Sequence, residues 1–180
     1  MIVRVVIGGS GGQGILTLGK LIAYACNKKK YFVSALPTYS AEMRGGYIYT
    51  FLSISQNKEI FSPVSESCDI GIFLNDISYK MLKKYLKKDP YIILNSSLIK
   101  NKSKNRKIIE IPATEIAEKI GDIRITNMVI AGAFVKLINE KFLKFEKKYL
   151  ISEVERIISD AQTKNLCTIA IEQGYKTTNL

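Results

Sequence analysis

The chain has 180 residues, 47% of them hydrophobic and 24% charged, a balance that predicts one globular domain over residues 1–180. It has no histidine and only three widely spaced cysteines, which excludes Ser-His-Asp triads and the usual zinc sites, so we expect no metal site and no catalytic residue of its own. The net charge of +11 comes from scattered lysines without interleaved aromatic residues, and no signal peptide or membrane span is evident. We therefore expect a cytoplasmic protein that binds neither nucleic acid nor membrane.

A glycine-rich loop near the start of the chain follows the first predicted strand. The segment Ile2 to Ile7 is β-branched and almost wholly apolar, as in a strand covered on both faces, and the apolar spacing from Ile15 to Asn27 predicts a helix. Glycine allows positive φ and close approach of a ligand, and the start of a helix offers free N–H groups and a positive dipole end. The loop therefore predicts a site for an anionic cofactor group, formed by Gly9, Ser10, Gly11, Gly12, Gln13 and Gly14.

This loop matches no common nucleotide motif completely. The stretch from Gly9 to Gly14 fits G-x-G-x-x-G, but Ile15 and Leu16 stand where a triphosphate-binding loop has Lys and Ser or Thr. The second predicted strand ends in Ala-Leu-Pro-Thr at 35–38 and lacks the acidic residue that binds a dinucleotide ribose. The alternative interpretation is that the glycines serve only a tight turn and close packing of helix on strand.

A second loop follows the second predicted strand, Tyr31 to Leu36, which we expect to pair in parallel with the first strand through a right-handed βαβ crossover. Both loops then lie at the carboxyl edge of the sheet, where ligands of open α/β sheets bind. Arg44 is predicted to bind a phosphate or carboxylate, or alternatively to form an ion pair with Glu42. The predicted substrate or interface loop comprises Tyr39, Glu42, Arg44, Gly45 and Gly46.

The rest of the chain continues a β-α-β rhythm. Further strands are expected at Tyr47–Ser55, Asp69–Leu74, Tyr91–Leu94 and Lys107–Ile111. The turn at Gln56–Lys58 predicts a hairpin between the first of these strands and Glu59–Phe61. The expected fold is a three-layer α/β/α, Rossmann-like arrangement with a mostly parallel sheet and an antiparallel hairpin portion.

Helices are expected between and after these strands. One covers Ile77–Leu86, one begins at Pro112, and the all-round apolar segment Ile125–Leu137 predicts a buried helix in which Gly132 permits close contact with a neighbour. Two terminal helices are predicted, with Gly174 as a C-cap, over Ser152–Ser159 and Asp160–Glu172.

Six segments, taken together, resemble a known family. They are GSGGQG (9–14), PTYSAEMRGG (37–46), EIFSP (59–63), NSSLI (95–99), TNMVIAG (126–132) and KNLCTIAIEQGY (164–175). In this order and spacing they resemble, over essentially the whole chain, the gamma subunit of 2-oxoacid:ferredoxin (acceptor) oxidoreductases. The EMRGG and NSSLI segments are more similar to the 2-oxoglutarate or branched-chain branch than to the pyruvate branch.

The resemblance implies a subunit that has no activity alone. Such complexes convert a 2-oxoacid, coenzyme A and oxidised ferredoxin to acyl-CoA, CO2 and reduced ferredoxin, with thiamine diphosphate and iron–sulfur clusters mainly on partner subunits of alpha, beta and delta type. This chain is then expected to help form the coenzyme A side of the active site through its glycine loop and Arg44. Two alternatives stay open: a free-standing NAD(P)-binding oxidoreductase and a purely structural assembly subunit.

Overall fold

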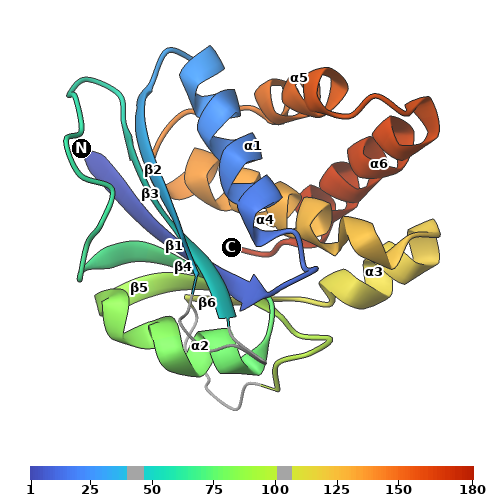
Figure 1. Ribbon diagram of the computed structural model, residues 1–180, viewed down its shortest axis with the longest axis horizontal. Helices are drawn as coiled ribbons and strands as arrows, with labels where there is room; N and C mark the ends of the chain where they lie inside the picture. Colours follow the sequence, from blue (N-terminus) through green and yellow to red (C-terminus); the bar gives the residue numbers. More distant parts are fainter. Residues whose placement is uncertain (40–46, 101–106) are drawn as a thin grey trace.

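A six-stranded mixed sheet with strand order β2-β3-β1-β4-β5-β6 forms the centre of the computed structural model, which describes residues 1–39, 47–100 and 107–180 (Figure 1). The strands β1, β4, β5 and β6 pair in parallel, whereas β3 is antiparallel to both of its neighbours, β1 and β2. The predicted α/β class with a mostly parallel sheet is therefore confirmed. The strands are β1 Ile2–Ser10, β2 Phe32–Tyr39, β3 Tyr47–Ser55, β4 Cys68–Phe73, β5 Leu86–Asn95 and β6 Ile108–Ile111.

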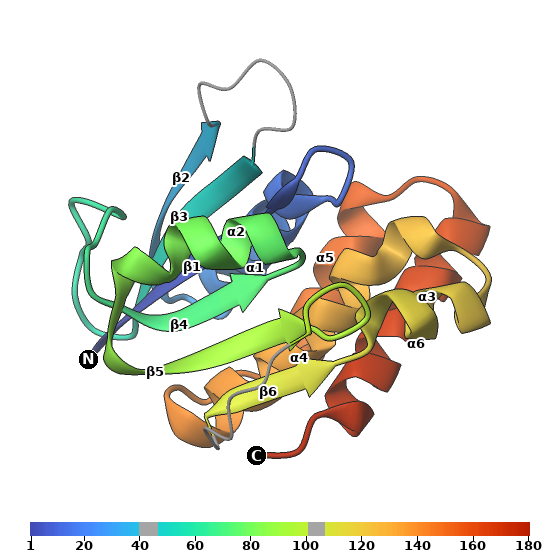
Figure 2. The ribbon, with the colours of Figure 1, turned by 90° about the horizontal axis from the view of Figure 1, so that it is seen from below.

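Helices cover both faces of the sheet. Helix α2 packs on one face, and the other five lie on the opposite face, as the two perpendicular views show (Figures 1 and 2). None of the helices in the described parts of the chain is long and apolar enough to cross a membrane. The helices are α1 Ile15–Lys28, α2 Asp76–Leu82, α3 Ala113–Ile120, α4 Thr126–Lys141, α5 Lys147–Ile157 and α6 Ala161–Thr177.

The position of β2 differs from the prediction. It was expected to pair with β1 as a core strand, but β3 lies between them and β2 is the exposed edge of the sheet. Pro37 fits an edge strand because its nitrogen has no hydrogen to donate to a further strand. β3, by contrast, is buried on both faces from Thr50 to Ser55 and pairs with a strand along each of its edges.

The predicted hairpin between β3 and Glu59–Phe61 is wrong. Both hydrogen-bonding sides of β3 are already occupied, by β1 and β2, so no edge is free for residues 59–61. These residues lie outside any strand, and the Phe61 side chain is 95% exposed. The antiparallel part of the sheet is the β2–β3–β1 arrangement instead.

Two glycines allow helices α4 and α6 to pack at their backbones. A Cβ atom at Gly132 would lie 2.1 Å from the carbonyl oxygen of Ile171, which confirms the predicted close contact. Gly174 is not a C-cap, because α6 continues to Thr177. A Cβ atom there would lie 1.8 Å from the Val129 carbonyl oxygen, so Gly174 serves the same helix contact.

Candidate functional site

The glycine loop lies at the carboxyl edge of the sheet and is tied to the neighbouring strand by polar side chains. The Ser10 N–H donates to Oε1 of Gln13 over 2.7 Å, which closes the loop on itself. Asn75, two residues after the end of β4, donates from Nδ2 to Oγ of Ser10 and to Oε1 of Gln13. Its Oδ1 accepts the N–H of Ser78 and caps α2. The loop therefore has a defined position before any ligand binds.

The positions in the loop require glycine for different structural reasons. A Cβ at Gly9 would lie 2.5 Å from Cδ1 of Ile15, and Gly12 and Gly14 have φ values of +84° and +68°. Gly11 has neither reason, because its φ is not positive and the atom nearest to an added Cβ would be 3.9 Å away. The turn-and-packing interpretation thus accounts for Gly9, Gly12 and Gly14, whereas Gly11 is an exposed glycine with open space in front of it.

Several helices begin around this loop. Within the described chain, no side chain caps the first turn of α1, so its N–H groups and positive dipole end are available to an anion, whereas α4 continues from a 3-10 turn that Asp122 caps. Helix α3 differs, because Oδ1 of the buried Asn95 accepts the N–H of Ala113 over 3.1 Å. Asn95 also donates to the Leu74 carbonyl and to Oγ1 of Thr114, which ties β5 to β4 and α3.

A pocket of about 260 Å³ lies where the loop and these helices meet, and we call it the carboxyl-edge pocket. Of the described residues that line it, Arg124 alone is charged. The guanidinium donates from Nε and Nη2 to the Asp122 carboxylate, and these hydrogen bonds lower the pKa of Asp122 and raise the pKa of Arg124. The pocket is lined by Gly12, Gln13, Leu98, Thr114, Ile123, Arg124 and Thr126.

The structure brings together only part of the predicted site. The residues Gly9 to Gly14 form the loop beside the carboxyl-edge pocket, with Gly12 and Gln13 in its wall. Tyr39 is the last residue of β2, 63% exposed and two strands away from β1. The remaining predicted loop residues, Glu42, Arg44, Gly45 and Gly46, lie outside the described residues.

Four residues of this region were missed as functional candidates. Asn75 and Asn95 follow apolar strands directly, a position that predicts a polar side chain at the ligand edge. Arg124 and Asn127 gave no such signal, because they reach the loop only through the packing of α4 against α1.

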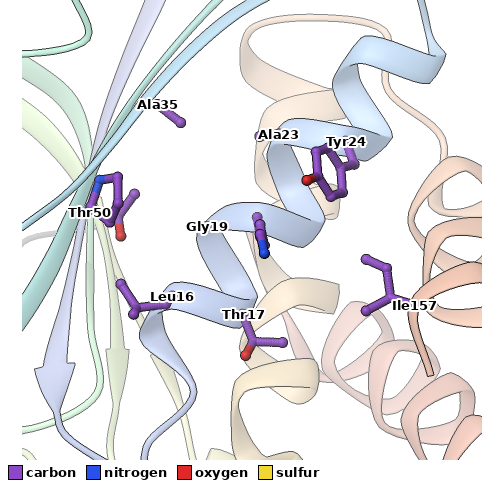
Figure 3. Close-up of a pocket in the computed structure, with 10 residues that line it drawn as sticks. Leu16, Thr17, Gly19, Ala23, Tyr24, Ala35, Thr50 and Ile157 are labelled. Carbon is purple, nitrogen blue, oxygen red and sulfur yellow. The ribbon is translucent and has the colours of Figure 1, made fainter. Parts of the chain in front are cut away.

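A larger pocket, of about 550 Å³, lies elsewhere. It runs along α1 from Leu16 to Tyr24 and is bounded by β2 and β3 (Figure 3). Gly19 of α1 and Thr50 of β3 both line this groove (Figure 3), and a Cβ atom at Gly19 would lie 2.9 Å from Cγ2 of Thr50. The Thr50 hydroxyl is buried and has no hydrogen-bond partner within the described chain. Its walls are mainly apolar, and Lys20 is the charged residue among those that line it.

The three cysteines are buried, unpaired thiols. Burial raises the pKa of Cys68 to about 12 and that of Cys167 to about 11, and it raises the pKa of Cys26 further. Since the thiolate is the reactive form, these side chains act as apolar core residues at neutral pH.

Comparison with known proteins identifies the family. Residues 4–177 match the family described as pyruvate ferredoxin/flavodoxin oxidoreductase. The chain belongs to this family. Among curated members of the family, a ketoisovalerate oxidoreductase subunit from Methanothermobacter thermautotrophicus is 29% identical over 160 residues, which are 87% of this chain and 33% of that protein. The chain thus spans about a third of the length of the first curated relatives it matches.

Solved structures of the same family share the fold. The gamma subunit of a keto/oxoacid ferredoxin oxidoreductase from Geobacter sulfurreducens superimposes with a TM-score of 0.81 at 21% identity, covering 97% of each chain. The 2-oxoglutarate:ferredoxin oxidoreductase from Magnetococcus marinus, solved with 2-oxoglutarate, coenzyme A and succinyl-CoA bound, gives a TM-score of 0.84 at 20% identity. That match covers 98% of this chain and 31% of the other.

The family match does not select a substrate. Its curated members are named for ketoisovalerate, indolepyruvate, pyruvate and 2-oxoglutarate. The predicted preference for 2-oxoglutarate over pyruvate therefore stays a prediction.

Proposed function

We propose that this chain is the gamma-type subunit of a cytoplasmic, multi-subunit 2-oxoacid:ferredoxin oxidoreductase and that its carboxyl-edge pocket binds phosphate groups of coenzyme A. Family membership and the gamma-subunit fold support the first part. In the longer relatives the matched region is about a third of the polypeptide, so we propose that this region supplies one part of the enzyme and that partner subunits supply the rest. We assign thiamine diphosphate, the iron–sulfur clusters and the ferredoxin contact to those alpha-, beta- and delta-type partners.

The observation that carries the second part is that the uncapped start of α1 and the Arg124 guanidinium lie beside the exposed backbone of the glycine loop. Gly11 leaves room for a close approach, the start of α1 is uncapped within the described chain, and Arg124 lies in the pocket wall. Helix N-termini and a guanidinium are the groups that favour phosphate in proteins. The Asp122 carboxylate holds the guanidinium in place and leaves Nη1 to a ligand. Coenzyme A supplies the thiol that accepts the acyl group.

The fold argues against a free-standing NAD(P)-dependent enzyme. In a dinucleotide-binding sheet the strand carrying the ribose-binding acid lies beside the strand with the glycine loop. Here β3 separates β2 from β1, which places the end of β2 about 10 Å from β1 at the usual strand spacing. A purely structural subunit is disfavoured by Gly11, whose lack of a side chain serves neither the turn nor the packing.

Steady-state kinetics of the reconstituted complex test the coenzyme A assignment. We expect Arg124→Ala and Gly11→Val to raise the apparent KM for coenzyme A by about tenfold or more, as the loss of a charge-assisted hydrogen bond predicts, with kcat at saturating coenzyme A largely retained. Gly12 is unsuitable because any other residue would be strained at its φ of +84°.

Arg156→Ala is the matched control. Arg156 is also an exposed arginine held by a carboxylate, Glu153, but it belongs to α5 and lies outside the carboxyl-edge pocket. An unchanged KM for coenzyme A in both Arg124→Ala and Gly11→Val, or an equal change in Arg156→Ala, contradicts the assignment.

We also propose 2-oxoglutarate or a branched-chain 2-oxoacid, rather than pyruvate, as the substrate, on the basis of the EMRGG and NSSLI segments. Initial rates of the complex with pyruvate, 2-oxoglutarate and ketoisovalerate measure this directly. A kcat/KM highest for pyruvate contradicts the proposal.

A further inference from the structure

The outer edge of β2 is unprotected. β2 is the end strand of the sheet, and no strand of the described chain pairs with its outer side. Its sequence, Phe-Val-Ser-Ala-Leu-Pro-Thr-Tyr, contains no charged side chain. Soluble proteins normally protect an edge strand with charges, bulges, prolines or a covering element, because a free edge pairs readily with another strand. In β2 the proline at position 37 is the one such device, and it lies toward one end of the strand.

Pro37 also determines which backbone groups of β2 face outward. It lies opposite Thr50 of β3, and its nitrogen cannot donate to that strand. The pair is therefore of the non-hydrogen-bonded type, which alternates with the hydrogen-bonded type along an antiparallel ladder. Ala35 and Val33, two and four positions earlier, consequently direct both N–H and C=O away from β3. Within the described chain, these groups are available to a further strand.

Apolar surface borders this edge on both faces of the sheet. On the face that α1 covers, the groove of about 550 Å³ separates α1 from β2, with Tyr24 and Ala35 on opposite sides (Figure 3). On the other face, Leu36 lies opposite Phe51 of the core under α2, and Phe32 and Leu36 are 41% and 43% exposed. Because strand side chains alternate between faces, a strand added to β2 would cover both of these surfaces.

The charge around the groove is positive. The elements α1, β2 and β3 contain two lysines and no acidic residue. Lys28 and the nearby Arg156 are both paired with Glu153, whereas Lys20 lines the groove and has no acidic partner within the described chain. A second copy of this chain, with its net charge of +11, would be repelled from this surface, and an acidic segment would be attracted to it.

We propose that an extended, acidic segment of a partner subunit pairs with β2 as a further strand of the sheet, an inference that rests on the proposed function. Apolar side chains at every second position of this segment fill the groove, and acidic side chains bind Lys20. The longer relatives carry about two thirds of their polypeptide outside the matched region, which is ample chain for such a segment. A helix in the groove would leave the outward groups of Val33 and Ala35 unpaired and Phe32 uncovered, so the geometry favours a strand.

Hydrogen exchange of the isolated chain and of the reconstituted complex tests the strand pairing. Mass spectrometry with residue-level fragmentation compares Val33 and Ala35, which face outward, with Ser34, which faces β3. We expect exchange at Val33 and Ala35 to be at least about tenfold slower in the complex, because their N–H groups gain acceptors, while Ser34 changes little. Exchange that is equally fast in both samples at Val33 and Ala35 would overturn the inference.

Two variants test the edge through binding, measured by titration calorimetry of the chain into the partner subunits. Ala35→Pro removes an outward N–H and, like Pro37, leaves the ladder with β3 intact. Leu36→Glu places a negative charge on the exposed apolar surface. We expect each to weaken the affinity by at least about tenfold, through the lost hydrogen bond and ring clash in one and charge repulsion in the other.

Ile77→Glu is the matched control, because Ile77 is a similarly exposed apolar residue that belongs to α2. It should leave the affinity unchanged, and a loss equal to that of Leu36→Glu contradicts the inference. Thermal melts of the isolated variants separate loss of binding from loss of folding, and Leu36→Glu, a change at an exposed side chain, keeps the test valid if Ala35→Pro unfolds. An acidic segment also requires that the affinity fall as salt is added, so an affinity independent of salt contradicts it.

The outcomes distinguish this inference from the proposed function. If the chain binds its partner subunits equally well after Ala35→Pro and Leu36→Glu, the proposed function stands and the assignment of the β2 edge is wrong. If the wild-type chain binds none of these subunits, the proposed function fails, and this inference fails with it. If sedimentation equilibrium shows that the chain alone is a dimer and that Ala35→Pro is a monomer, the edge pairs with a second copy and the partner-segment assignment is overturned.

Discussion

Substitution by alanine should change the free energy of unfolding strongly at Gly14 and hardly at all at Gly11. At Gly14 the φ of +68° costs an alanine about 1 kcal/mol or more, and its Cβ would lie 2.3 Å from Nδ2 of Asn127. Displacing that amide breaks its bond to the Gly14 carbonyl and adds about 1–3 kcal/mol. We therefore expect Gly14→Ala to lower the free energy of unfolding by roughly 2–4 kcal/mol.

At Gly11 the same change should be almost neutral. Its φ is not positive and the nearest atom to the new Cβ is 3.9 Å away, so Gly11→Ala should alter the free energy of unfolding by no more than about 0.5 kcal/mol. Guanidinium unfolding followed by circular dichroism gives both values, provided that the m-values agree with the wild type. Equal destabilisation by the two variants would refute the distinction between packing glycines and an open glycine, and with it the main argument for a ligand at Gly11.

Three further predictions follow from contacts described above. Asn95→Ala should lower the free energy of unfolding by about 2–4 kcal/mol, because it uncaps α3 and removes one of the two side-chain donors to the Leu74 carbonyl. Chemical denaturation measures this, and a loss below about 1 kcal/mol would contradict it. Gly174→Ala should cost at least about 2 kcal/mol, since the Val129 carbonyl oxygen cannot move away without shifting α4, and a thermal melt with unchanged midpoint would refute this reasoning. Because hydrogen bonds from Arg124 lower the pKa of Asp122, any stabilisation from this pair is present above the unfolded-state pKa of Asp122 and is lost as pH falls through its lower folded-state pKa. Arg124→Ala should raise the pKa of Asp122 toward its ordinary value, which an NMR titration measures. An unshifted titration curve would show that the pair does not form in solution.

Local patterns in the sequence predicted most elements of the fold. The apolar pattern placed α1, α4 and β6 within a few residues of their observed bounds, because α1 has one covered face and α4 is apolar all round. The strand β1 continues into the glycines as far as Ser10, where hydrogen bonds to β3 and β4 outweigh the weak strand preference of glycine. Element type was therefore more predictable than element length.

Strand order was less predictable, because it depends on pairings between distant segments. Tyr31 to Leu36 carries the composition of a core strand, yet Leu36 is 43% exposed at the edge of the sheet. The useful signal was Pro37, which disfavours a central position. It was interpreted only as the start of a loop.

Part of the candidate site could likewise be predicted from local sequence, and part depends on contacts between distant segments. The glycine loop could be predicted, since its composition is itself the signal. Arg124 could not, because it reaches the loop only when α4 packs beside α1, more than one hundred residues further along the chain. Asn127 was present in the quoted TNMVIAG segment, but its bond to the Gly14 carbonyl exists only in three dimensions.

The insertion of β3 between β1 and β2 also has a consequence for the order of folding. Val5 in β1 pairs with Leu52 on one side and with Ile70 on the other, so the central strand gains its partners only after long chain loops have closed. β2 and β3, by contrast, are consecutive antiparallel strands and can associate early. We expect this pair to form first and to dock onto β1 as a unit, which makes assembly of the sheet edge that carries the glycine loop a late and comparatively slow event in folding.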